Sequence, residues 1–167
     1  MALFTTILAG VSVFVIGQIF LKWVIEPIQQ LREVISQIIY LFANDNGTIH
    51  NAIIIDKEVA LSVSKELKSL GAKLISKQHL IPFYNKIYKW LKLPEEKNLL
   101  EAAKKLSSIS NIMFEKGSSD IYLKLDLYRK QVCEYCLVQD PIDSYSIEEL
   151  KKDLDQLKNK NITNFSF

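Results

Sequence analysis

Two cysteines, Cys133 and Cys136, are the residues of this sequence whose type and spacing most readily suggest chemistry. Thiols three residues apart on a helix could form a disulfide, bind a metal or carry out redox reactions. A structural zinc site needs four ligands, and His50 and His79 lack the paired spacing that would complete one. A thioredoxin-like motif opens a helix within a βαβ unit, and this one lies deep in a helical stretch. We therefore expect two half-buried thiols, no metal and no cofactor, and we keep a thiol-based sensor as an alternative.

Basic and aromatic side chains alternate in the segment from Phe83 to Lys92, FYNKIYKWLK. Lys86 and Lys89 lie three residues apart, so a helix would place them on one face. Such a face can bind phosphates while aromatic rings stack on bases, and it can equally rest on anionic lipid headgroups. The simplest alternative is a solvated lysine face above an apolar core.

Lysines also recur on a long helix expected before this segment: Lys65, Lys68, Lys73 and Lys77. The net charge of the chain is only +2, so a single copy should attract polyanions weakly. Several copies around one axis would concentrate these lysines into a positive chamber. We assign the binding of an anionic ligand to five residues, Arg32, Lys73, Lys77, Lys86 and Lys89.

The acidic residues show no arrangement typical of an active site. Most are matched by lysines on polar faces, as in the i, i+4 pair of Glu101 and Lys105. No activated nucleophile is paired with a base, and Gly47, Gly71 and Gly117 stand alone rather than in a phosphate-binding loop. We therefore predict that the chain is not an enzyme.

The first structural element expected along the sequence is an uncharged run of residues. Residues 1–21 contain no Asp, Glu, Lys, Arg or His. Twenty helical residues cover about 30 Å, which is the thickness of the hydrocarbon core of a bilayer. No positive charge precedes the run, and it ends in Lys22 and Trp23 rather than in a cleavage site, unlike a signal peptide. We predict a transmembrane helix over residues 1–25, with the N-terminus outside and the lysine-rich remainder in the cytoplasm.

Small residues recur within this helix at spacings of four, three and four residues: Thr6, Gly10, Val13 and Gly17. A narrow stripe of this kind lets transmembrane helices pack closely, although glycine is also common in membrane helices by chance. Gln18 shares a face with Lys22, where both would line a watery opening or lie among headgroups. We assign a pore or helix interface to Thr6, Gly10, Val13, Gly17 and Gln18.

An amphipathic helix is predicted over residues 26–44, directly after the membrane segment. Apolar residues recur at spacings of three and four from Ile28 to Phe42, and this stripe must be buried against other copies or beneath the domain. Pro27 removes one backbone donor, so we expect a kink or tight break rather than a flexible linker. The loop-forming residues Asn44 to Gly47 should end the helix.

Residues 45–158 have the pattern of a helical cytoplasmic domain that senses a ligand. Ser146 and Glu149 form a capping box for its last helix, and residues 159–167 should be a frayed tail. The predicted fold class is therefore all-α, with one N-terminal transmembrane helix that continues into a small helical cytoplasmic domain.

The stretch from Leu8 to Ile39 resembles a widespread set of short bacterial single-pass membrane proteins. The shared residues are Gly17 to Ile19, GQI, and Ile25 to Arg32, IEPIQQLR, and the resemblance fades after residue 115. Members are similar to the membrane effector of the Hailong anti-phage system. The resemblance implies a homo-oligomeric ion channel in the bacterial inner membrane, gated by a cytoplasmic domain that senses short oligodeoxyadenylate strands.

The leading hypothesis is thus a channel effector in anti-phage defence. Its partners would be the lipid bilayer, further copies of itself, with a tetramer as the expected assembly, and a short single-stranded DNA made by a neighbouring nucleotidyltransferase. The alternative is a membrane-anchored helical interaction protein without conduction. Unitary currents would distinguish the two, because only a channel produces them.

Overall fold

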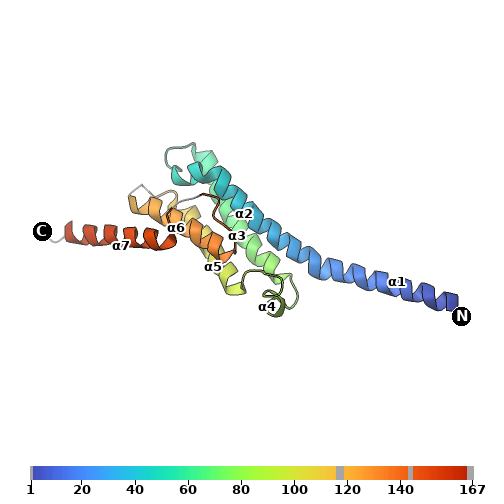
Figure 1. The fold of residues 1–167 in the computed structure, drawn as a ribbon. Helices are drawn as coiled ribbons and strands as arrows, with labels where there is room; N and C mark the ends of the chain where they lie inside the picture. The colour runs from blue at the N-terminus through green and yellow to red at the C-terminus, as the bar shows by residue number, and fades with distance from the viewer. Residues whose placement is uncertain (1, 116–118, 143–144, 165–167) are drawn as a thin grey trace.

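The computed structural model describes residues 2–115, 119–142 and 145–164. Every regular element in this part of the chain is a helix, so the predicted all-α class is confirmed. The elements are α1 (Ala2–Phe20), a π-helical turn η1 (Leu21–Ile25), α2 (Glu26–His50), α3 (Lys57–His79), α4 (Tyr84–Ile87), α5 (Glu96–Ile112), α6 (Ser119–Tyr135) and α7 (Ile147–Asn164). Figure 1 shows α1 projecting as a rod from the packed helices, with the two chain termini at opposite ends.

The long apolar helix α1 continues through η1 into α2. By length and composition, the helix Thr6–His50 contains a stretch apolar enough to cross a membrane. Every side chain from Thr6 to Phe20 is exposed, whereas α2 buries one face. Exposure continues past the first charge of the sequence, Lys22, and the first partly buried side chain is that of Val24.

The helix passes through Pro27 without a flexible linker, as expected, but also without the predicted tight break. The irregularity is one wide π-helical turn, in which the Glu26 amide donates to the Leu21 carbonyl oxygen. A proline ring in a regular helix crowds the carbonyl four residues earlier, and a wider turn relieves that crowding. Pro27 itself lies in the first turn of α2, where its missing amide costs least.

The break expected at Asn44 to Gly47 is found at one residue of this run. The backbone leaves helical geometry only at Asp45, with φ −107° and ψ 17°, and helical turns resume as far as His50. Ile49 in the resumed turn is 4% exposed, and the Asn46 side-chain oxygen accepts a hydrogen bond from Arg129. These tertiary contacts stabilise the helical turns that follow the break at Asp45.

The core lies between α2, α3, α5 and α6, which pack on one another in a bundle. The apolar stripe of α2 is buried, as its spacing predicts, and Leu31 and Phe42 are fully enclosed. Full burial of one such side chain stabilises the fold by about 1.5 to 3 kcal/mol. Gly71 lies in mid-helix at the closest approach of α3 to α5, where a β-carbon would stand 3.3 Å from the Ala103 carbonyl oxygen. The absence of a side chain at Gly71 therefore allows α3 and α5 to pack closely.

Helix α7 begins at the predicted capping box. The Ser146 amide donates to Glu149 Oε2 at 2.8 Å, and the Glu149 amide donates to Ser146 Oγ at 3.2 Å. The helix extends to Asn164, so the predicted tail over residues 159–167 is helical for most of its length, and residues 165–167 lie outside the described part.

Candidate functional site

The five residues assigned to a pore or interface lie on the exposed helix α1. Val13 is 71% exposed, and a β-carbon built at Gly10 or Gly17 would meet no atom within 4 Å. Gln18 and Lys22 line the same hollow on the helix, of about 430 Å³, in agreement with their predicted common face. Monomeric soluble proteins rarely expose a continuous apolar surface of this kind, so this helix requires lipid or another protein surface around it.

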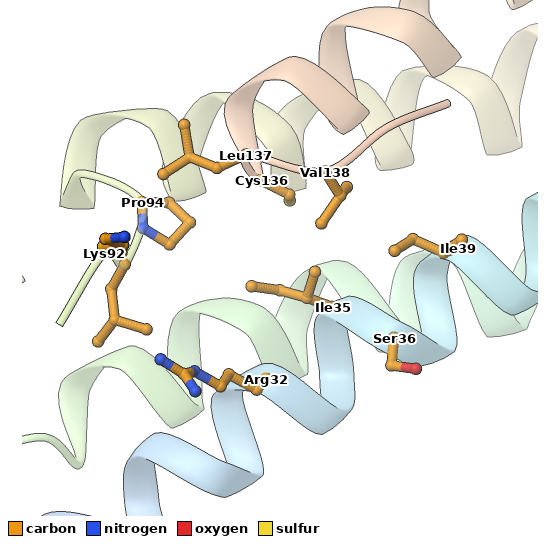
Figure 2. Close-up of a pocket in the computed structure, with 10 residues that line it drawn as sticks. Arg32, Ile35, Ser36, Ile39, Lys92, Pro94, Cys136, Leu137 and Val138 are labelled. Atoms are coloured by element: carbon orange, nitrogen blue, oxygen red, sulfur yellow. The ribbon is translucent and has the colours of Figure 1, made fainter. Parts of the chain in front are cut away.

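A pocket of about 270 Å³ lies where α2, the segment after α4 and the end of α6 meet. Figure 2 shows Arg32 and Ile35 on α2 facing Lys92 on one side and Val138 on the other. The Arg32 side chain donates from Nη2 to the Leu91 carbonyl oxygen at 3.1 Å. Two cationic side chains beside apolar walls can hold an anionic group together with an apolar or aromatic one.

Two strained backbone positions border this pocket. Lys92 has φ 51° and Leu137 has φ 57°, and both residues line the pocket. Each follows a helical turn that closes with a Schellman pattern, as in the 3.0 Å bond from the Val138 amide to the Cys133 carbonyl oxygen. Glycine is usual at this position, because a β-carbon in the left-handed region costs about 1 to 2 kcal/mol. Strain of this kind concentrates at functional sites.

Replacing Leu137 with glycine is expected to raise the free energy of unfolding by about 0.5 to 1 kcal/mol. Glycine relieves the strain of the left-handed backbone, and this gain outweighs the larger conformational entropy that glycine gives to the unfolded chain. The side chain is 61% exposed, so its removal sacrifices little packing. Chemical denaturation followed by circular dichroism measures the change. Leu137→Ala is the matched control, because it keeps the β-carbon and the strain. Equal stability of the two variants would contradict this explanation.

Of the residues assigned to ligand binding, Arg32 lines this pocket, and the other four lie elsewhere. Lys77 Nζ donates to Gln30 Oε1 at 3.1 Å and ties α3 to α2, while Lys73 is exposed one turn earlier. Lys86 and Lys89 lie on the segment that contains α4, where each ammonium rests near an aromatic ring. The second cationic residue that lines this pocket is Lys92, which sequence reasoning left outside the assigned site.

The two cysteines are buried, with exposed fractions of 2% for Cys133 and 3% for Cys136. Burial raises the pKa of each thiol to about 12, and the negative charge of Asp140 adds to the shift at Cys133. The reactive thiolate is therefore scarce near neutral pH, which disfavours the thiol-sensor alternative. Cys136 contributes to the wall of the pocket instead.

A buried charge network, which sequence reasoning missed, lies at the far end of the domain from α1. Arg129 is 3% exposed and donates from Nη1 to Asp126 at 2.6 Å and to Asn46 at 3.0 Å. Its Nε lies 3.3 Å from Asp140, and His50 Nε2 lies 3.3 Å from Asp126. The network joins the end of α2, helix α6 and the turn after it. The only available signal was Arg129 itself, one of two arginines in a lysine-rich chain.

Burial acts to raise the pKa of Asp126, but the hydrogen bond from His50 and the charge of Arg129 outweigh it, so this pKa lies below its ordinary value. The stabilisation that Asp126 provides is present above the unfolded-state pKa, about 3.9, and is lost as the pH falls through the folded-state value. Asp126→Asn should therefore flatten the acid limb of the stability profile, measured by thermal melts across pH. Parallel acid limbs in variant and parent would contradict the assignment.

The described side chains offer binding chemistry in the pocket and an apolar surface on α1. Within residues 2–115, 119–142 and 145–164, no three His, Cys, Asp or Glu side chains gather to hold a metal ion. Arg32 and Lys92 supply the cations of the pocket, and the uncharged α1 supplies a surface for lipid. No family model, no curated protein and no solved structure matches this chain.

Proposed function

We propose that the chain is a homo-oligomeric membrane channel in the bacterial inner membrane, in which α1 crosses the bilayer and the helical domain controls opening. The observation that carries the proposal is the full exposure of an uncharged apolar helix from Thr6 to Phe20 beside a domain that buries its own core. Removing that surface from water is strongly favourable, at about 25 cal/mol for each Å² of apolar area. A bilayer meets this requirement along the whole length of α1.

Conduction requires several copies, because one helix cannot enclose a pore. The open face of Gly10 and Gly17 allows a neighbouring helix to approach closely. Gln18 and Lys22 share a face near the inner end of the span, where polar groups would meet the water of a pore. The excess of lysine after residue 21 favours a cytoplasmic domain. We take the assembly to be a tetramer.

The regulatory ligand is proposed to be a short oligodeoxyadenylate, in keeping with the resemblance to the Hailong effector and a role in anti-phage defence. Arg32 and Lys92 would hold a phosphate of the strand, while Ile35 and Val138 would contact a base. Arg32 belongs to the same continuous helix as the span, so a ligand that prefers one orientation of α2 shifts the equilibrium of α1. The π-helical turn at Leu21–Ile25 is the point in this helix where its winding can change.

Planar-bilayer recordings on the purified full chain test the proposal. We expect reproducible unitary currents whose open fraction changes when oligodeoxyadenylate is added on the side of the domain. An oligothymidylate of the same length should have little effect. Arg32→Gln should weaken the response to oligodeoxyadenylate by at least about tenfold, since it removes a charge-assisted contact.

Absence of unitary currents under all of these conditions would overturn the channel and favour a membrane-anchored interaction protein. Currents that ignore oligodeoxyadenylate would instead keep the channel and remove the ligand. A Lys57→Gln variant serves as the control for loss of charge, because Lys57 is exposed at the start of α3, at the opposite end of that helix from Lys77.

A further inference from the structure

An apolar notch of about 680 Å³ separates the long helix from the segment that contains α4. One wall runs from Ile16 to Ile28 across the junction of α1, η1 and α2, and the other runs from Pro82 to Leu91. Every residue that lines the notch is apolar or aromatic. Figure 1 shows α4 at the end of the packed helices nearest α1. The volume is in the range of sites that hold a ligand rather than a few waters.

The α4 segment presents large aromatic side chains that the domain leaves uncovered. Phe83 is 75% exposed, Trp90 is 85% exposed and Trp23 on the opposite wall is 70% exposed. Phe83 also has φ 55°, a left-handed backbone that fixes an exposed aromatic residue at the start of α4. Aromatic side chains of this kind are typical of the boundary between headgroups and acyl chains, where one edge is wet and the other is apolar.

The position of the notch along the helix corresponds to that boundary. A span that begins near residue 2 and covers about 30 Å ends near residue 22. The wall from Ile16 to Ile28 therefore straddles the inner surface of the bilayer. Lys22 lies beside Pro82 in an adjoining hollow, and Lys86 Nζ lies 5.9 Å from the centre of the Phe83 ring. Glu26 also lines that hollow, so the rim of the apolar notch has two ammonium groups and one carboxylate.

We propose that this notch binds an anionic phospholipid, with an acyl chain between the two walls and the phosphate against Lys22 and Lys86. The inference rests on the proposed membrane span, and it makes the α4 segment a second point of membrane attachment. A second copy of the chain is the competing occupant, and the experiment below distinguishes it from lipid.

The chain has two tryptophans, so single substitutions report on each wall separately. Trp23→Phe leaves Trp90 as the only indole, and Trp90→Phe leaves Trp23. Each variant of the full chain is reconstituted into vesicles of phosphatidylcholine and phosphatidylglycerol, with bromine atoms on the acyl chains of one lipid or the other. We expect Trp90 emission to be quenched, and more strongly when the bromines are on phosphatidylglycerol at equal fraction. Circular dichroism verifies that both variants keep their helix content.

In the Trp23→Phe background, Lys86→Gln should reduce the preference for phosphatidylglycerol by about fivefold, the contribution of one lysine near an anionic surface. Lys57→Gln, at the far end of α3, should leave the preference unchanged. Quenching of Trp23 without quenching of Trp90 would overturn the lipid site while keeping the span. Quenching of neither would overturn both. Blue-shifted but unquenched Trp90 emission would indicate a second copy in the notch, and equal quenching by the two lipids would overturn the anionic preference.

Discussion

Replacing Arg129 with leucine is expected to lower the free energy of unfolding of the helical domain by about 3 to 5 kcal/mol, the usual cost of breaking a buried ion pair. The guanidinium is almost fully enclosed and holds together Asp126, Asp140 and Asn46. Without it, Asp126 and Asp140 each lose their most deeply buried cationic partner, although His50 stays near Asp126 and Lys130 near Asp140. Chemical denaturation followed by circular dichroism in detergent measures the loss.

A second ion pair in the same molecule provides the control. Lys104 and Glu101 have the same spacing of three residues as Arg129 and Asp126, but the Lys104 side chain is 59% exposed. Exposed pairs are screened by solvent, so Lys104→Leu should change stability little. Arg129→Lys should fall between the two leucine variants, because it keeps the charge and loses the forked geometry. Equal losses in Arg129→Leu and Lys104→Leu would contradict the role given to the buried network.

The features that the sequence predicts correctly are those set by local rules. The apolar stripe of α2 follows from its spacing, and the start of α7 follows from the Ser146–Glu149 capping box. The exposed uncharged helix follows from the absence of charge before Lys22. In each case the interacting groups lie within one or two helical turns, so the interaction can be predicted from neighbouring residues alone.

The features that escape prediction join residues far apart in the chain. Arg32 bonds to a carbonyl 59 residues away, and Arg129 bonds to Asn46 across 83 residues. The first contact places Arg32 in a pocket with Lys92, and the second ties the helical turns after Asp45 to α6. No periodicity encodes such pairs. This is why Arg32 alone, of the five residues assigned to ligand binding, lines this pocket.

Pro27 shows the same difference between what local rules predict and what the rest of the structure decides. Proline lacks a backbone donor and its ring clashes with the preceding turn, and these two local properties correctly predict an irregularity in the helix near Pro27. These properties do not specify whether the chain breaks or widens, because that depends on the surroundings of the preceding turn. Here a π-helical turn keeps α1 and α2 in one continuous helix, and the stripe of α2 lies in the core.

Substituting leucine for both Gly10 and Gly17 should abolish unitary currents and dissociate the oligomer, if the stripe is the helix interface. Overpacking a tight contact costs about 1 to 3 kcal/mol at each position, which for two positions weakens association by roughly thirtyfold or more. Oligomer mass in detergent and bilayer recordings measure the two effects. Ser12→Leu is the matched control, because it also enlarges a small residue of α1 but on a different face. An unchanged oligomer mass in the double variant would remove the stripe from the interface, whereas loss of assembly in Ser12→Leu as well would show that any added bulk on α1 is disruptive.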